Sequence, residues 1–231
     1  MSTGRETTAP EQARTTTGRV WNGRTRDERR SDRHERLLEA GIEIMGTRGT
    51  REVTVRSVCR ATRISERHFY ELFDTKEDFV AAVYDRVIGD GIALLTNAAA
   101  TPVADRGQAL RDLLGSWIDF ITEDPRRGRI IAVEAATNPE LAQRGRQVAV
   151  GLIQIYLDYT SPDPAAEADP IDAEISATVL FTGIWGLLLT WQDDALGNHL
   201  TRDELIDRLA GLIERAEPPR RIRSDTGGKR R

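Results

Sequence analysis

Apolar residues recur at helical spacing through most of this chain, and this periodicity limits the possible folds more than any other feature. Near the start, Leu38, Ile42 and Met45 follow one another at intervals of four and three residues. Such spacing places apolar side chains on one face of an α-helix, whereas a half-buried strand would show strict alternation. The sequence contains no credible strand pair, hairpin signal or internal repeat. We therefore expect an all-α protein.

Capping residues and helix breakers divide the periodic region into successive helices. Ser31 or Asp32 is expected to cap the first helix, Thr54 the second and Ser65 the third. The segment 161–170 contains three prolines and is expected to be a loop. The expected helices cover residues 32–48, 55–62, 66–72, 76 to shortly before 102, 105–122, 125–136, 139–159, 171–196 and 201–216.

Composition divides the chain into four parts. Residues 1–30 are rich in Thr, Arg and Gly and have almost no periodic apolar residues, so we expect a disordered, Arg-rich arm. Residues 31–78 form a three-helix unit, and residues 79–216 form a larger helical domain. Residues 217–231 contain Pro-Pro, Gly-Gly and six basic residues and are expected to be a disordered basic tail.

Charge is distributed unevenly along the chain. The formal net charge is −4, and residues 81–216 hold 11 arginines against 21 acidic residues. Both termini are basic, with seven arginines against four acidic residues in 1–30. Contact with DNA would therefore require individually placed cations, because the body repels a polyanion. Whether the two basic ends take part in such contact stays open.

The segment from Thr54 to Lys76 predicts a helix-turn-helix, because two short capped helices flank a tight turn. Val55, Val58, Cys59, Ile64, Phe69 and Phe73 are spaced to face inward. The remaining side chains suit DNA: arginine can donate two hydrogen bonds to guanine, and hydroxyls and cations suit phosphate oxygens. We expect Arg67 and Glu66 to read bases, and Arg56, Tyr70 and Lys76 to bind phosphates. The full set of expected DNA-binding residues is Thr54, Arg56, Ser65, Glu66, Arg67, His68, Tyr70 and Lys76.

This segment resembles the N-terminal domain of TetR-family (tetracycline-repressor-like) transcriptional regulators. The family pattern is a capped helix, a turn and a Tyr-x-x-Phe-x-x-Lys run, and here Tyr70, Phe73 and Lys76 have that spacing. The resemblance is specific over residues 37–83 and beyond them is one of helix layout. One departure is Arg63, which stands where the family usually has Gly in the turn. A left-handed conformation costs a non-Gly residue about 1–2 kcal/mol, so the turn is either strained or capped differently.

The resemblance implies a ligand-responsive regulator that binds a palindromic operator as a homodimer, with repression the commoner mode and activation not excluded. It implies that the helices at 171–196 and 201–216 form the dimer interface, which suits the nearly all-apolar run at 183–191. It also implies that the middle helices enclose a small, hydrophobic effector. Expected lining residues of that pocket are Trp117, Phe120, Glu134, Asn138, Tyr156 and Trp185.

Other functional classes find little support in the sequence. Asp193 and Asp194 are adjacent on a helix and point in different directions, so they do not form a catalytic pair, and no phosphate loop or nucleophile motif is present. We expect no enzyme, no cofactor and no metal, and the single cysteine, Cys59, is expected to be a buried thiol. No apolar run approaches the length of a membrane span, and the start of the chain has no apolar signal region, so a cytoplasmic protein is expected. A helical, dimeric adaptor that does not bind specific DNA is the alternative.

Overall fold

The computed structural model describes residues 25–99, 105–160, 170–192 and 200–216, and within these ranges it is helical with no strand. The elements are α1 (Arg26–Arg48), η1 (Thr50–Glu52), α2 (Val55–Thr62), α3 (Glu66–Tyr70), α4 (Lys76–Ala99), α5 (Arg106–Glu123), α6 (Pro125–Gly128), η2 (Arg129–Glu134), α7 (Ala135–Thr137), α8 (Pro139–Thr160), α9 (Pro170–Gln192) and α10 (Arg202–Ala216). The expected all-α fold is confirmed.

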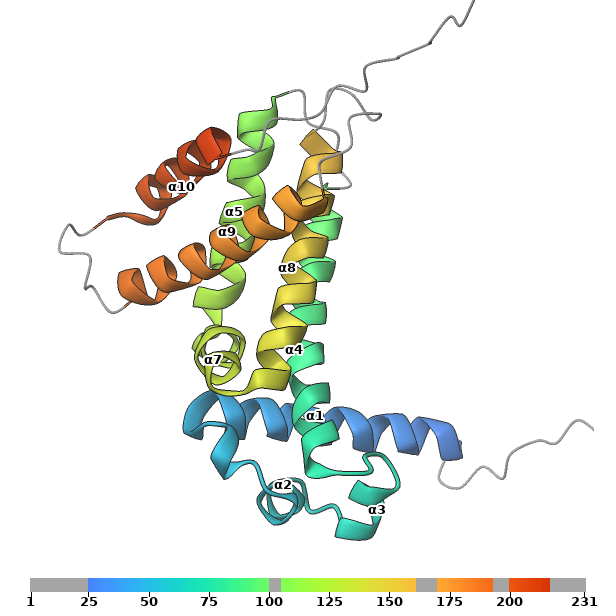
Figure 1. Ribbon diagram of the computed structural model, residues 1–231. Helices are drawn as coiled ribbons and strands as arrows, with labels where there is room; N and C mark the ends of the chain where they lie inside the picture. The colour runs from blue at the N-terminus through green and yellow to red at the C-terminus, as the bar shows by residue number, and fades with distance from the viewer. Residues whose placement is uncertain (1–24, 100–104, 161–169, 193–199, 217–231) are drawn as a thin grey trace, which may run out of the picture.

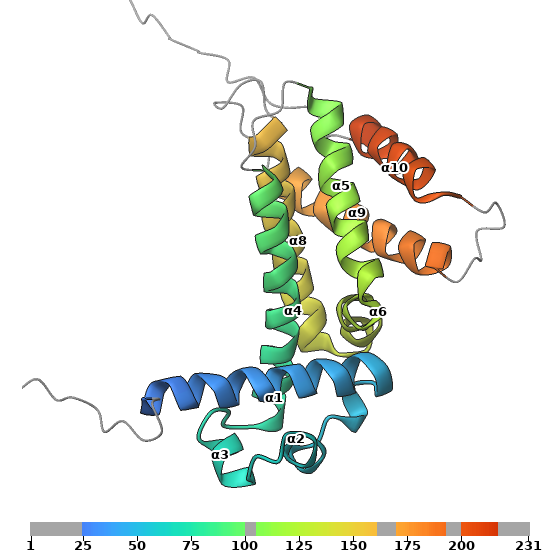
Figure 2. The ribbon, with the colours of Figure 1, turned by 180° about the vertical axis from the view of Figure 1, so that it is seen from behind.

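The helices form two layers joined by the long helix α4 (Figure 1). At the base, α1 lies across α2 and α3, and these three helices with the intervening turns make up the helix-turn-helix head, residues 26–75. Above it stands a helical body in which α4 packs against α5 and α8. Figure 2, the view from behind, shows α10 beside α5, and the chain contacts confirm that these two helices pack together.

The first helix begins earlier than the sequence predicts. Thr25, not Ser31 or Asp32, is the N-cap: Glu28 N donates to Thr25 Oγ1 at 3.2 Å, and Thr25 N donates to Glu28 Oε2 at 2.6 Å. This reciprocal capping box begins a helix without needing apolar residues in its first turns, which is why apolar periodicity missed it. Residues 25–30 therefore belong to the cap and first turns of α1 and not to an arm, while residues 1–24 and the predicted tail at 217–231 lie outside the described residues.

Two further boundaries differ from expectation. The third helix ends at Tyr70 and not near Leu72. The helix expected over 125–136 is divided into α6, the π-helical turns of η2 and α7. A π-helical stretch is rare and is frequently found at functional sites. Part of the penultimate helix, at 193–196, falls outside the described residues.

One apolar core runs through head and body. In the head, Phe69, Phe73 and Phe79 form a cluster with ring centroids 5.0–5.4 Å apart. In the body, Trp191 Nε1 donates to Leu200 O at 2.7 Å and ties the end of α9 to the start of α10. No helix in the described part of the chain is long and apolar enough to cross a membrane.

Candidate nucleic-acid interface

Helix α2 owes its position to a cap at its start and a buried face along its length. Ser57 N donates to Thr54 Oγ1 and Thr54 N to Ser57 Oγ, each at 3.0 Å, so the predicted cap is confirmed. Val58 and Cys59 are buried. Burial, with a smaller contribution from the carboxylate of Glu66, raises the pKa of the Cys59 thiol. The thiol is therefore a core group, as expected, and not a reactive one.

The turn between α2 and α3 places Arg63 in the left-handed region, at φ 58° and ψ 29°. Among the described residues it is the one non-glycine with a positive φ. The turn is also capped from outside, because the Arg36 guanidinium on α1 donates to Thr62 O at 2.5 Å. Thr62 Oγ1 accepts from Ile64 N at 3.3 Å within the same turn. Both alternatives left by the sequence therefore apply: the backbone is strained, and α1 supplies an additional cap.

Helix α3 is short, and α1 holds its far end as well. Ser65 caps its start through a 3.4 Å bond from His68 N, and Ser65 Oγ lies 3.0 Å from His68 Nδ1. At the other end, Arg30 on α1 donates to Glu71 O at 3.3 Å. Arginine side chains at helix C-termini satisfy the last carbonyls and oppose the helix dipole. Arg30 and Arg36 thus fix the two short helices against α1.

The predicted DNA-binding side chains lie mostly on the outside of the head. His68 and Lys76 are half-buried, and six are exposed: Thr54, Arg56, Ser65, Glu66, Arg67 and Tyr70. Arg67 pairs with Glu71 at 3.3 Å, and Lys76 with Glu77 at 3.3 Å. Both pairs are largely exposed and would release their cations at little cost.

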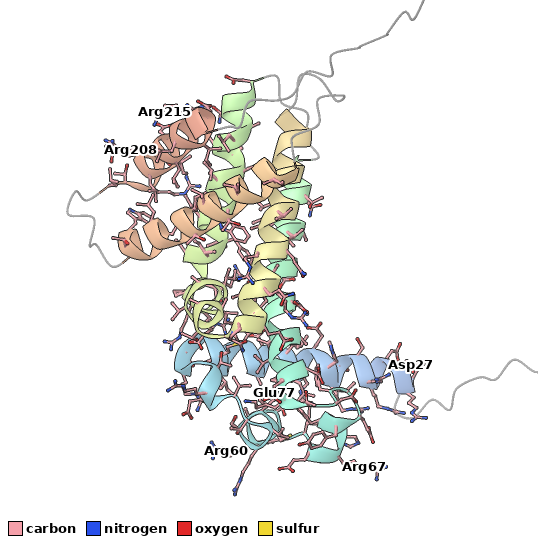
Figure 3. The ribbon with its side chains drawn as sticks, viewed as in Figure 1. Asp27, Arg60, Arg67, Glu77, Arg208 and Arg215 are labelled. Carbon is pink, nitrogen blue, oxygen red and sulfur yellow. The ribbon has the colours of Figure 1, made fainter. Side chains whose placement is uncertain are left out.

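Arg60 and Arg63 also belong to this surface. The list of DNA-binding residues predicted from the sequence contained neither of them. Figure 3 shows Arg60 and Arg67 projecting from the base of the head, away from the body. Arg60 follows Arg56 by four residues on α2, so the two share a helix face. A search for cations at this spacing would have found it.

Three arginines of this surface have unpaired side chains. Among the described residues, the guanidinium groups of Arg56, Arg60 and Arg63 make no hydrogen bond or ion pair. Several arginines of the body are instead neutralised by carboxylates: Arg86 by Glu35, Arg111 by Asp207, and Arg202 by Asp119. An acidic protein therefore presents unpaired positive charge on its base, where a helix-turn-helix would meet DNA.

The helix-turn-helix region matches a family model described as bacterial regulatory proteins, tetR family, over residues 37–83. This part of the head is therefore similar to that family. The match begins in α1, ends in α4 and includes both short helices. It confirms the resemblance drawn from Tyr70, Phe73 and Lys76.

A curated relative of this chain is a transcriptional regulator. The HTH-type transcriptional activator FasR of Mycolicibacterium smegmatis is 26% identical over 140 residues, which cover 60% of this chain and 64% of that protein. The match thus spans less than two thirds of the relative's length. The matched family and this relative are both described as regulators.

Solved structures extend the likeness in fold to most of the chain. FadR of Bacillus subtilis, in complex with stearoyl-CoA, has a TM-score of 0.61 at 15% identity and covers 78% of this chain and 97% of that one. A transcriptional regulator of Rhodococcus sp. RHA1 has a TM-score of 0.59 at 22% identity and covers 80% and 99%. At these identities the likeness shows the fold alone, and it extends over the body as well as the head.

Head and body meet where α1 crosses α6 and η2. Arg126 donates to Glu43 at 2.8 Å and to Asp124 at 2.7 Å, and it lies 3.3 Å from Glu39. The Arg126 hydrogen bonds hold the pKa of the Asp124 carboxyl below its ordinary value. Asp124 in turn caps α6 by accepting from Arg126 N at 3.1 Å.

The four predicted pocket residues whose side chains the structure describes do not form one group. Trp117 and Phe120 do meet: both are buried and their rings stack at 5.7 Å. Glu134, by contrast, turns its carboxylate to the head, and Asn138 Oδ1 caps α8 by accepting from Glu140 N at 3.0 Å. Sequence reasoning could not foresee these two partners, because each depends on where neighbouring segments lie. The side chains of Tyr156 and Trp185 are outside the described residues.

The Trp117–Phe120 pair packs on Gly91 of α4. A Cβ built at Gly91 would lie 2.6 Å from Trp117 Cζ3, so only glycine allows α4 to approach the stacked rings this closely. On the other side of Phe120, the Arg127 guanidinium lies 4.5 Å from the ring centroid. An aromatic wall inside the body thus contacts the helix that leads to the head.

Proposed function

We propose that this protein is a dimeric transcriptional regulator that binds operator DNA through α2, α3 and the turn between them, and that a small hydrophobic effector modulates this binding. The observation that carries the proposal is the head itself, in which the unpaired guanidinium groups of Arg56, Arg60 and Arg63 lie on α2 and in the turn before the short capped helix α3. Such a surface supplies phosphate contacts in an otherwise acidic molecule.

Within this proposal the side chains have distinct roles. Arg67 is exposed near the start of α3, the helix that enters the major groove, and is assigned to base reading with Glu66. Arg56 and Arg60 are assigned to phosphates on one strand. Lys76 opens α4, where its ammonium adds to the positive end of that helix and suits another phosphate.

Binding to the DNA that flanks the protein's own coding region tests the proposal. The full chain is titrated into labelled duplexes at about 150 mM salt, where non-specific binding typically has a Kd of about 10⁻⁴–10⁻⁶ M. A much tighter Kd for one duplex than for a shuffled one supports the proposal, and equal values favour the adaptor. Arg56→Ala is expected to weaken binding to every sequence alike, whereas Arg146→Ala, an exposed arginine on α8, is the control that leaves it unchanged.

The direction of regulation is tested separately. Transcription in vitro from a bound promoter falls if the protein is a repressor. A rise would instead make it an activator, as its relative FasR is named.

Exposed apolar residues on α9 support the homodimer. Ile171, Ile175 and Val179 are spaced by four residues and are 68%, 57% and 64% exposed, and Leu212 on α10 is 52% exposed. A stripe of this kind costs free energy in water and fits a self-complementary helical interface. Sedimentation is expected to give a dimer for the unchanged chain and a monomer for Val179→Asp. A dimer of unchanged stability in Val179→Asp would remove α9 from the interface.

A fatty acyl thioester is the effector that we nominate. It is supported by the apolar body, with its aromatic wall of Trp117 and Phe120, and by the fold shared with the stearoyl-CoA complex of FadR. At 100 times its Kd, a ligand that binds only the folded state stabilises it by about 2.7 kcal/mol. Stearoyl-CoA is therefore expected to raise Tm and change the Kd for DNA, and free coenzyme A, the control, should do neither. An effect of both compounds alike would reject the acyl chain as the recognised group.

A further inference from the structure

A groove of about 510 Å³ runs between the N-terminal half of α1 and the turn before α3. The head therefore has a second concave surface beside its reading helix. In Figure 1 this half of α1 extends over α3, on the side of the head where Figure 3 places Arg67. The groove is lined by Arg29, Asp32, Arg33, Arg36, Arg63, Ile64, Ser65 and His68.

The groove is strongly cationic. Four guanidinium groups line it against a single carboxylate, that of Asp32. Arg36 has one nitrogen bonded to Thr62 O, whereas Arg63 has no hydrogen-bonding or ionic partner among the described residues. Arg33 Nε is shielded from solvent and likewise lacks a hydrogen-bond partner there. A donor that is shielded from solvent without a partner, such as Arg33 Nε, is costly, and an anion in the groove would satisfy it and also pair with the exposed guanidinium of Arg63.

The backbone at Arg63 gives an independent reason to connect the groove with function. Its left-handed conformation disfavours every residue with a Cβ, and glycine would remove the cost. Strain of this kind persists where the surrounding structure enforces it and is concentrated at ligand-binding sites. At this position the strain brings a long cationic side chain to the mouth of the groove.

We propose that this groove binds the sugar-phosphate backbone of DNA next to the base pairs that α3 reads, with Arg63 and Arg33 as its phosphate ligands. Guanidinium forks match phosphate oxygens, and the groove adjoins the reading surface, so one duplex can contact both. The proposal rests on the DNA-binding function proposed above. It adds to that function a contact that carries no sequence information and that lengthens the protein's footprint on the duplex.

Salt-dependent binding of the full chain to duplex DNA tests the groove. Arg63→Gly removes the cation and relieves the backbone, so Tm is expected to rise while affinity falls for specific and shuffled duplexes alike. Each lost phosphate contact reduces the slope of log K against log salt by about 0.9. The deficit in affinity of Arg63→Gly should therefore be about threefold larger at 50 mM salt than at 200 mM. Arg63→Lys is expected to restore most of the slope.

The matched control is Arg48→Ala, which removes an exposed arginine from the other end of α1, and its slope should stay that of the unchanged protein. A slope of Arg63→Gly equal to the control's would overturn the groove as a phosphate site, even if operator binding is specific. Absence of any preference between specific and shuffled duplexes would instead overturn the proposed function. The groove could still be tested in that case, because the salt slope on shuffled DNA reports on its phosphate contacts. If Arg63→Gly lowers the salt slope without changing Tm, the phosphate contact is supported equally, because the slope measures the contact whereas Tm measures only stability.

Discussion

The carboxylate of Glu134 accepts a hydrogen bond of 2.7 Å from the backbone amide of Thr50, which lies 84 residues earlier in the chain. The same carboxylate accepts from Arg129 Nε at 3.1 Å and is itself buried. Thr50 follows Gly49, whose φ of 93° turns the chain from α1 toward α2. A charged acceptor in the π-helical part of the body thus holds the hinge of the head, and charge-assisted bonds of this kind are stronger than neutral ones.

Glu134→Ala is expected to lower the free energy of unfolding by about 2 kcal/mol, because it leaves the Thr50 amide and the Arg129 guanidinium without their acceptor. Glu134→Gln keeps one acceptor oxygen and should lose less. Urea unfolding measures both. The control is Glu140→Ala, whose exposed pair with Arg144 should change stability by no more than about 0.5 kcal/mol. Equal values for Glu134→Ala and the control would show that the hinge bond carries no stability.

Gly46→Ala is expected to destabilise the protein by about 1–3 kcal/mol, although alanine favours helices. A Cβ at Gly46 would lie 2.4 Å from Arg126 Cβ and 2.9 Å from Arg126 Cα, so α1 and α6 must move apart. Gly89→Ala is the matched control, because a Cβ there meets nothing within 4 Å, and it should stabilise by about 0.5–1 kcal/mol. Changes in Tm of opposite sign for the two variants would confirm the close approach of α1 and α6. A higher Tm for both variants would refute it.

Arg67→Ala is expected to cost about 1–3 kcal/mol in binding to the operator and to relax preference at particular base pairs. It should leave stability nearly unchanged, since its pair with Glu71 is 87% and 44% exposed. Glu71→Ala, which frees the same guanidinium, should leave the base preference as it is. Binding to a panel of single-base operator variants provides the comparison. An unaltered preference in Arg67→Ala would transfer the reading role to another residue.

Tyr84→Phe is expected to stabilise the protein by about 1 kcal/mol near neutral pH, because the Tyr84 hydroxyl is buried and has no partner among the described residues. Burial, with a smaller contribution from the carboxylate of Asp85, raises the pKa of Tyr84 to about 12. The folded state therefore retains a proton that the unfolded chain, with an ordinary pKa of about 10, releases. The stability of the unchanged protein is therefore unaffected by this titration below pH 10 and falls as pH rises from 10 toward 12.

The advantage of Tyr84→Phe should accordingly grow by about 1 kcal/mol between pH 9 and pH 11. Urea midpoints at pH 7, 9 and 11 measure it. A constant difference between the two proteins over this range would mean that Tyr84 titrates normally in the folded state.

Local hydrogen bonding made much of the head predictable from sequence. Thr54 and Ser65 each accept a hydrogen bond from an amide three residues later, so the residue types alone predict the starts of α2 and α3. The left-handed turn at Arg63 was likewise visible as a departure from the family pattern. Apolar spacing then assigned Val58 and Phe69 to the core, where both lie.

Contacts between distant segments could not be predicted in this way. Arg36 reaches Thr62 O across 26 residues, and Glu134 reaches Thr50 across 84, so either partner is fixed only once α1 has packed. The sequence was equally compatible with a place for Glu134 in an apolar pocket and with a contact to the head, because the sequence of a helix does not show where the oxygens of a buried carboxylate point. The start of α1 was missed for a different reason: its first turns are polar, and a capping box holds them instead of a buried face.

Because Arg30 and Arg36 bind the short helices to α1, the helices α1, α2 and α3 are held together as one unit beside the start of α4. Helix α4 contains 24 residues, which gives a lever arm of about 36 Å. A tilt of only about 5° about its far end would carry Lys76 through about 3 Å, close to the rise of one base pair at about 3.4 Å. A small repacking against the aromatic wall at Gly91 is therefore geometrically sufficient to displace the head by about the rise of one base pair.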